Sequence, residues 1–491
     1  MNPLALEPEA MRAMGHRTVD LLVELLAQAE RPPLRRASPE EMAARMPFGA
    51  SEGPQDFEAL LARLERDVLP FMSNSAHPGY MAFVPNSGTF AAALGDFLAS
   101  ALSVYVGSWM EGPGPSRVEL VVLDWFKEWI GYPSEAAGVL VTGGSAANLT
   151  ALACARETLL GPMDERAALY VSDQAHASVA RAARVLGFRP DQVRVLPTDS
   201  DQRLQAETVA TAIRSDADAA RRPLAVVAAA GATNTGAIDP LERLAAVCRE
   251  HDVWLHVDAA YGGFAALTER GRGALAGLEL ADSVTLDPHK WLYQPIECGS
   301  LLVREGHLLR RAFEIEQDYL LDAAGETGEV NFGDLGLQLT RGFRALKVWL
   351  SVSHFGVAAF RAAIDNSLDL AELARRRIAG DDRLESIARG ELGITCFRRR
   401  VDGDEKEAAE ANAALIAAYE ATGRGLVSST RLDGRYAVRL CVLNHTTRVE
   451  DVEAVLDFFA STPLGPRADL DGARSPHMMD VGAGWLRPAR R

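Results

Sequence analysis

Lys290 is the residue of this sequence best placed to do covalent chemistry. It stands in TLDPHKWLYQP, residues 285–295, directly after the strand-like run 281–286. In open α/β sheets, ligands bind at the carboxyl ends of the strands. A lysine at such a point either binds phosphate or acts as a nucleophile. Its ammonium can also extend into solvent, so the neighbouring residues must decide between these roles.

The other lysines offer no competing candidate. Only four of the 51 basic residues are lysines. Lys127 lies in the amphipathic stretch LDWFKEWI, Lys347 in a helical stretch and Lys406 in the polar stretch DGDEKEAAE. We predict that these three are surface charges.

Asp258 is an acid at the end of a second strand-like run, WLHVDAAYGG, residues 254–263. An acid in this position often caps the following turn. In close contact with a cationic ring nitrogen, it would instead favour the protonated nitrogen by about 1–3 pKa units. Asp258 is therefore a candidate partner for a pyridine ring.

A third strand end carries two glycines and a serine. In VLVTGGSAANLTAL, residues 139–152, a strand passes through Gly143, Gly144 and Ser145 into a helix. Such a turn can serve only as a connection. Glycines also let the backbone approach an anion, and a helix N-terminus supplies free N–H groups with a favourable dipole. The turn could therefore bind a phosphate.

Lysine, acid and phosphate turn together match one cofactor. Pyridoxal 5′-phosphate (PLP) holds an aldehyde that forms an imine with lysine, and its ring acts as an electron sink. The sequence predicts PLP as the cofactor.

Regular elements must bring these residues together. Short apolar runs alternate with helical stretches such as 145–160, 177–188 and 240–251. Near-continuous apolar character is typical of strands covered on both faces, so we predict an α/β fold with a mostly parallel sheet. The predicted strands are 138–144, 168–173, 192–199, 224–233, 253–260, 283–288 and 300–305.

The flanking regions are predicted to be separate parts. Residues 11–28 carry the amphipathic stripe of a packing helix. Residues 343–378 form a long helical stretch with a break expected at Gly356. A smaller α+β part follows, with a strand at 435–443 and a helix at 448–461.

Composition limits the class of protein. A chain of 491 residues exceeds the size of a single core, so two or three domains are expected. The net charge of −16 argues against nucleic acid as a partner. No apolar run is long enough to span a membrane, and the N-terminus lacks the pattern of a secretory signal. We expect a cytoplasmic protein.

Cysteine usage adds no further site. The five cysteines have no paired spacing, which argues against a disulfide framework. A metal site formed by Cys248, His251 and His256 was considered, but no pair of them has zinc-type spacing. We predict no bound metal.

Six ordered motifs show a family resemblance. The sequence resembles the group II PLP-dependent amino-acid decarboxylases, such as the aromatic-L-amino-acid, tyrosine, histidine and glutamate decarboxylases, over roughly residues 10–465. The motifs are HPGYMAFVP (77–85), GGSAANLTAL (143–152), VSDQAHASVARA (171–182), GATNTGAIDP (231–240), HVDAAYGG (256–263) and DPHKW (287–291).

The resemblance implies a fold and its division. The fold would be the PLP-dependent transferase fold, or fold type I, with a seven-stranded sheet in the large domain. Its expected parts are a helical N-terminal dimerisation segment (1–75), a large PLP-binding domain (76–370), a small C-terminal α+β domain (371–465) and a loosely ordered tail (466–491).

The resemblance also assigns roles around the cofactor ring. Lys290 would hold the cofactor as a Schiff base, and Asp258 would pair with its pyridinium nitrogen. Ala260 would pack under the ring, and His176 would stack on the opposite face. A histidine with this environment would otherwise be taken for an ordinary core residue.

Further implied roles concern the phosphate and the hydroxyl group of the cofactor. Gly144 and Ser145 would bind the phosphate, with His289 beside it and near the substrate carboxylate. Thr233 would approach the cofactor hydroxyl or Asp258.

Tyr319 is the residue that indicates which reaction the enzyme catalyses. It falls where aromatic decarboxylases carry a mobile-loop tyrosine that protonates the product carbanion, and it would act with His176. The alternative is a surface tyrosine in a polar connection.

The substrate pocket is predicted from the same resemblance. It would contain Phe83, Val84, Pro85, Asn86 and Tyr105. Val84 stands where aromatic decarboxylases tend to have a second aromatic residue, and Asn86 where they have threonine. These departures alter the volume and polarity of the pocket.

The implied function is decarboxylation of an L-amino acid, with an aromatic substrate favoured, to an amine and CO2. Alternatives are an aldehyde-forming oxidative relative, a decarboxylase of a glutamate-like or aliphatic amino acid, an aminotransferase of the same fold, and a non-catalytic protein that retained the fold. The resemblance also implies a homodimer with shared active sites.

Overall fold

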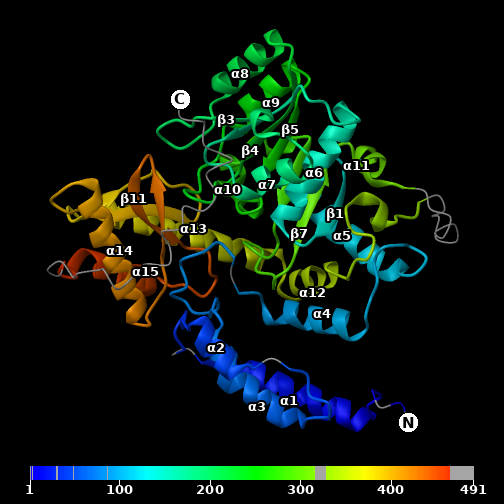
Figure 1. The fold of residues 1–491 in the computed structure, drawn as a ribbon, viewed down its shortest axis with the longest axis vertical. Coiled ribbons are helices and arrows are strands. Elements are labelled where there is room, and N and C mark those ends of the chain that lie inside the picture. Colours follow the sequence, from blue (N-terminus) through cyan, green and yellow to red (C-terminus); the bar gives the residue numbers. More distant parts are fainter. Residues whose placement is uncertain are drawn as a thin grey trace.

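A seven-stranded sheet forms the centre of the fold in a computed structural model (Figure 1). The structure describes residues 2, 4–28, 31–47, 49–85, 87–315 and 328–464. The sheet order is β1-β7-β6-β5-β4-β2-β3. Its strands are β1 Ala137–Val141, β2 Ala167–Ser172, β3 Val193–Leu196, β4 Arg222–Ala229, β5 Trp254–Asp258, β6 Ser283–Leu286 and β7 Gly299–Val303.

The mostly parallel sheet predicted from the sequence is confirmed. The pairs β2·β3, β2·β4, β4·β5 and β5·β6 are parallel, whereas β7 runs antiparallel to both β1 and β6. All six residues of β2 are buried, as expected for a strand covered by helices on both faces. The register places Asp258 beside Ala229 of β4 and Thr285 of β6, so the ends of three strands meet at one edge.

The described residues form fifteen α-helices. They are α1 Pro8–Ala27, α2 Pro39–Arg45, α3 Phe57–Asp67, α4 Phe90–Ala101, α5 Pro113–Ile130, α6 Gly144–Leu159, α7 Ala177–Val185, α8 Ala206–Asp218, α9 Leu241–Glu250, α10 Glu269–Ala274, α11 Gly306–Phe313, α12 Ala345–Phe355, α13 Val357–Ala379, α14 Glu405–Ala421 and α15 Val449–Ser461. The predicted break at Gly356 is confirmed, because this residue has a φ of 76° between α12 and α13.

A smaller sheet lies in the C-terminal part, with the order β10-β11-β9-β8. Its strands are β8 Leu384–Ser386, β9 Ile394–Arg399, β10 Ser428–Leu432 and β11 Arg435–Cys441. The segment before α4 joins this part, since Tyr80 bridges Leu426 and Met81 is completely buried in its core. Helix α13 crosses the predicted boundary at residue 370, and the division into domains stays a prediction.

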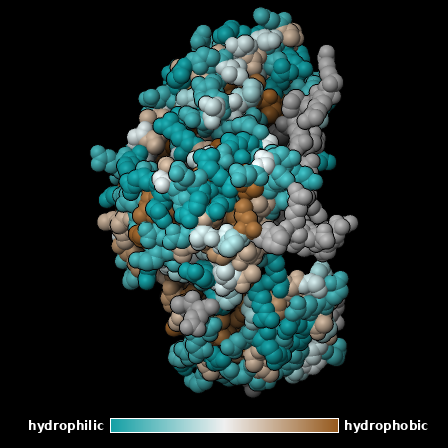
Figure 2. Space-filling model, turned by 90° about the vertical axis from the view of Figure 1, so that its left-hand side faces the viewer, coloured by the Kyte–Doolittle hydropathy of each residue, from teal (hydrophilic) through white to brown (hydrophobic). Residues whose placement is uncertain are grey.

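The N-terminal helices α1, α2 and α3 lie away from the large sheet, at the lower end of Figure 1, and they form the lower lobe in Figure 2. Helix α4 packs against α12. Several large apolar side chains on α1 and α4 are exposed, among them Leu22, Val23, Phe97 and Leu98. No helix in the described ranges has the length and apolar character needed to cross a membrane.

The prediction that Lys347 is a surface charge is wrong. Its side chain on α12 is buried, with Nζ 2.7 Å from Asp96 Oδ2 on α4. The ammonium also donates to the carbonyls of Pro295 and Glu297, at 3.2 and 3.1 Å. An ion pair and two carbonyl acceptors stabilise a charge that would otherwise be costly to bury. A helical pattern alone could not reveal these partners.

Candidate active site

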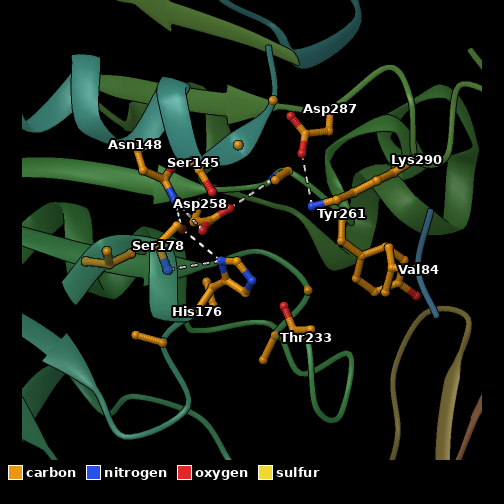
Figure 3. A pocket seen from close by; sticks show the side chains of 18 of the residues that line it. Val84, Ser145, Asn148, His176, Ser178, Thr233, Asp258, Tyr261, Asp287 and Lys290 are labelled. Carbon is orange, nitrogen blue, oxygen red and sulfur yellow. Dashed lines mark hydrogen bonds and ion pairs between the residues drawn. The ribbon is translucent and has the colours of Figure 1, made fainter. Parts of the chain in front are cut away.

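A cavity of about 540 Å³ opens at the carboxyl ends of the central strands (Figure 3). Eleven of the residues predicted from the sequence line it. They are Phe83, Val84, Pro85, Gly144, Ser145, His176, Thr233, Asp258, Ala260, His289 and Lys290.

Three predicted residues are not part of this lining. Asn86 and Tyr319 lie outside the described residues. Tyr105 pairs with Gly342 in an isolated antiparallel bridge and does not line the cavity. The assignment of Tyr105 and Asn86 to the substrate pocket, and of Tyr319 to proton transfer, stays a prediction.

Lys290 reaches the cavity from a tight turn after β6. The turn closes with a hydrogen bond from the Lys290 N–H to the Asp287 carbonyl at 2.9 Å. The Lys290 Nζ lies 3.0 Å from Asp287 Oδ2, and the Asp287 side chain is only 2% exposed. Sequence reasoning did not identify Asp287 as a site residue. Its position three residues before Lys290, after the apolar strand, was the available signal.

The turn before α6 is shaped for close backbone approach to a ligand. Gly143 has a φ of 155°, and a Cβ there would lie 3.0 Å from the His289 ring. A Cβ on Gly144 would lie 3.0 Å from Asp287 Oδ2. The first N–H groups of a helix have no partner inside it, so those of α6 are suited to an anion.

His176 is the N-cap of α7, and its tautomer follows from its hydrogen bonds. The Ser178 backbone N–H donates to His176 Nδ1 at 3.3 Å, and Ser178 Oγ lies 2.8 Å from the same nitrogen. Because Nδ1 accepts, the neutral ring carries its proton on Nε2. Burial lowers the pKa of His176, and the nearby Asp258 opposes this shift. The ring is therefore neutral around pH 7.

His289 is held in a different way. Its Nδ1 donates to the Cys298 carbonyl at 2.6 Å, and its Nε2 lies 3.7 Å from Asp287 Oδ2. Burial lowers the pKa of His289, and Asp287 opposes the shift. The imidazole is fixed beside Gly143, where a phosphate at the α6 N-terminus would be within its reach.

Asp258 lies at the end of β5, opposite Lys290 across the cavity in Figure 3. Its Oδ2 accepts from Asn148 Nδ2 at 2.8 Å, and its Oδ1 accepts from the Ala260 N–H at 3.2 Å. These two N–H donors fix the position of the carboxylate at the edge of the cavity. Sequence reasoning missed Asn148, although it lies within the motif GGSAANLTAL, one helical turn after Gly144.

Arg439 is the third functional candidate, after Asp287 and Asn148, that the sequence reasoning missed. It belongs to β11 and lines the cavity, and it is 7% exposed. Its Nη1 donates to Ser428 Oγ at 3.0 Å, whereas its Nε is buried without a partner in the described part of the chain. Only the approach of β11 to the large sheet reveals that this arginine faces the site.

These features fit PLP. The cavity combines a lysine amine, a carboxylate held by donors and a helix N-terminus where a Cβ at Gly144 would be crowded by Asp287 and Ala260. Asp287 Oδ1 is a buried oxygen without a partner among the described residues, so it could accept a hydrogen bond from a bound ligand. Within the same ranges no cluster of His, Cys, Asp or Glu could hold a metal ion.

Comparisons with known proteins agree with this interpretation. Residues 39–400 match the model of the pyridoxal-dependent decarboxylase conserved domain. An aromatic-L-amino-acid decarboxylase of Bacillus atrophaeus is 37% identical over 457 residues, which are 92% of this chain and 95% of the relative.

Two solved structures are also similar to this chain. The crystal structure of Oryza sativa TDC with PLP and tryptamine has a TM-score of 0.89 and 30% identity, and the match covers 94% of this chain and 98% of that one. Rhodiola rosea 4-hydroxyphenylacetaldehyde synthase has a TM-score of 0.86 and 26% identity, with 93% and 98% covered.

The chain belongs to the pyridoxal-dependent decarboxylase family. It is an enzyme, a carboxy-lyase of fold type I, and its cofactor is PLP. The resemblance, fold class and cofactor predicted from the sequence are confirmed.

Proposed function

We propose that this enzyme decarboxylates an aromatic L-amino acid to the corresponding amine and CO2. The observation that carries the proposal is a single cavity that joins Lys290 and Asp258 to the apolar wall of Phe83, Val84 and Pro85. The Bacillus atrophaeus relative is named for aromatic substrates, and the Oryza sativa TDC structure contains tryptamine. Both names support the choice of an aromatic side chain.

The residues around the cofactor have distinct tasks in this proposal. Lys290 would hold the cofactor through its amine. Gly144, Ser145 and His289 would bind the phosphate, and Thr233 would approach the ring substituents. Ala260 and His176 would contact the ring.

Bound PLP supplies an electron sink that stabilises the negative charge left on the substrate α-carbon when CO2 departs. Asp258 keeps the ring nitrogen protonated, because an opposite charge in contact favours the charged form. Asn148 holds the Asp258 carboxylate in place through its bond of 2.8 Å.

Proton return to the α-carbon needs a neutral donor beside the cavity. His176 has its proton on Nε2 when neutral, because Nδ1 accepts from Ser178. Tyr319, which lies outside the described residues, is the proposed final donor, and His176 assists it.

Arg439 is the proposed site for the substrate carboxylate. Its guanidinium is buried and lines the cavity, and its Nε has no hydrogen-bond partner within the described ranges. Arginine binds carboxylates through two parallel hydrogen bonds, and this geometry would orient the bond that breaks.

A panel of amino acids tests the proposal. Purified enzyme with added PLP should produce amine from at least one of Phe, Tyr, Trp and DOPA. Glutamate and aliphatic amino acids serve as comparison substrates, since Val84 and Asn86 alter the volume and polarity of the predicted pocket. Absence of amine from all four aromatic substrates would reject the aromatic assignment.

The same assay separates the aldehyde-forming alternative. Rhodiola rosea 4-hydroxyphenylacetaldehyde synthase shares the fold, so products should be analysed for aldehyde and peroxide as well as amine. Keto-acid product would indicate an aminotransferase. Borohydride reduction followed by peptide mapping should place the label on Lys290, and a label on Lys127, Lys347 or Lys406 would reject the covalent role.

We further propose a cytoplasmic homodimer with shared active sites. Exposed apolar side chains on α1 and α4 support a subunit interface, because monomers rarely expose contiguous apolar surface of this kind. Light scattering of the purified enzyme should give twice the chain mass of 52.9 kDa. A mass of one chain at micromolar concentration would reject the dimer.

A further inference from the structure

Asn148 links Asp258 to His176 through a buried hydrogen-bond network. Its side chain on α6 is completely buried. Its Nδ2 donates to Asp258 Oδ2 at 2.8 Å and to Ser178 Oγ at 2.9 Å. Its Oδ1 accepts from Thr285 Oγ1 at 2.8 Å and from His256 Nε2 at 3.0 Å. All the hydrogen-bonding capacity of the amide is thus used, and two of its four partners belong to β5.

The orientation of the Asn148 amide is determined by a chain of donors that begins at Trp254. The indole N–H can only donate, and it bonds Ser283 Oγ at 2.8 Å. The Ser283 hydroxyl then donates to His256 Nδ1 at 2.9 Å, which leaves the proton of His256 on Nε2. Burial lowers the pKa of His256 to about 4, so the ring is neutral and donates only once, to Asn148 Oδ1. The Asn148 NH2 group must therefore face Asp258.

A second branch of the network reaches His176. The Ser178 hydroxyl accepts from Asn148 Nδ2 and donates to His176 Nδ1 at 2.8 Å. This bond and the Ser178 N–H both require Nδ1 to be an acceptor. The catalytic proton of His176 is consequently held on Nε2.

We propose that Asn148 is a positioning residue that acts on the cofactor through Asp258 and on proton return through Ser178 and His176. The inference rests on the proposed roles of Asp258 and His176. In Figure 3, Asn148, Ser178, Asp258 and His176 form a continuous group on one side of the cavity, opposite Lys290. Loss of the Asn148 donor would leave Asp258 less well held and would free the Ser178 hydroxyl to rotate away from His176.

The first test is Asn148→Asp, which keeps the shape but replaces the donor by a carboxylate. Above neutral pH, two adjacent carboxylates repel, and the hydrogen bond to Asp258 is lost. The dissociation constant of PLP from the apoenzyme should rise roughly 10- to 100-fold at pH 8.5, as expected for a lost hydrogen bond to a charged group. It is measured by absorbance and fluorescence titration, without substrate.

The pH dependence distinguishes positioning from a general structural role. At pH 6 the two carboxyl groups of the variant share a proton and regain a hydrogen bond, so the deficit relative to wild type should shrink by about fivefold or more. The other titratable or charged groups that face the network are Lys290, Asp287, His256, His176 and Arg181. Comparison with wild type at each pH cancels the titration of those groups that do not contact position 148, whereas the pKa of His256, 3.0 Å from Asn148 Oδ1, should rise in the variant.

Thr150→Val provides the matched control. Thr150 is also fully buried on α6, but its hydroxyl bonds only the Ala146 carbonyl of the same helix, at 2.8 Å. This variant should bind PLP like wild type at both pH values. A deficit in Asn148→Asp that is equal at pH 6 and 8.5, or a deficit of the same size in Thr150→Val, would overturn the proposal.

Ser178→Ala tests the second branch and does not depend on the folding of Asn148→Asp. It should leave PLP affinity within about threefold of wild type and lower kcat roughly tenfold with little change in KM, because it removes a single neutral hydrogen bond to His176, which assists the proposed proton donor. An unchanged kcat would overturn this branch. Wild-type enzyme that fails to bind PLP would instead refute the proposed function itself.

Discussion

Arg439→Met is the most direct test of how the enzyme holds its substrate. Arg439 is 7% exposed, and its Nη1 bonds Ser428 Oγ, which in turn donates to the Ala82 carbonyl at 2.6 Å. The guanidinium is thus fixed next to the Phe83 wall and already removed from water. A carboxylate that enters the cavity meets an arginine whose desolvation has occurred during folding.

The size of the effect follows from this geometry. Loss of a hydrogen-bonded charge pair costs about 1.5–3 kcal/mol, which corresponds to a rise in the KM of the amino acid of roughly 10- to 100-fold. The carboxylate becomes neutral CO2 during the reaction, so the contact is stronger in the bound substrate than in the transition state. Most of the loss should therefore appear in KM, with a smaller change in kcat.

Steady-state kinetics with the best substrate of the panel measure KM and kcat, and inhibition by the product amine supplies the control. The amine has the same side chain but no carboxylate, so its inhibition constant should be the same in wild type and Arg439→Met. Arg439→Lys keeps the positive charge but lacks the planar guanidinium, so its KM should lie between those of wild type and Arg439→Met. An unchanged KM in Arg439→Met, or an equal loss of amine and amino-acid binding, would refute the reasoning.

Three further predictions concern stability and the cofactor. Burial lowers the pKa of His256 to about 4 from an ordinary 6.5, so between these values the unfolded chain binds a proton that the native chain does not. The free energy of unfolding should therefore decrease by up to roughly 3 kcal/mol as pH falls from 6.5 to 4. Denaturant titrations measure this change, and His256→Gln should remove this part of the pH dependence. Glu119→Gln should lower the free energy of unfolding by about 3–5 kcal/mol, because it leaves the buried Arg341, 2.5 Å from Glu119 Oε1, without its counter-ion; a change below 1 kcal/mol would contradict this. Gly144→Ala should weaken PLP binding by about tenfold or more, since its Cβ would lie 3.1 Å from the Ala260 Cβ and 3.0 Å from Asp287 Oδ2. Gly114→Ala is the control and should not change PLP binding, because the space around Gly114 is open.

The sequence by itself determined the large sheet and the central chemistry of the site. All seven predicted strands are present, because most of them are short apolar runs typical of strands covered on both faces, as the fully buried β2 shows. Lys290, Asp258 and Gly144 could be placed at strand ends for the same reason, and parallel strands bring their carboxyl ends to one edge.

Only the tertiary structure decided which side chains complete and support that site. Arg439 reaches the cavity from β11, and Asn148 is bonded to residues more than one hundred positions away, such as Asp258 and Thr285. Lys347 is buried on α12, where an ion pair with Asp96 of α4 stabilises its charge. Local patterns record whether a residue favours a strand, a helix or a turn. The partner of a polar side chain depends on how distant elements pack, and no local pattern contains that information.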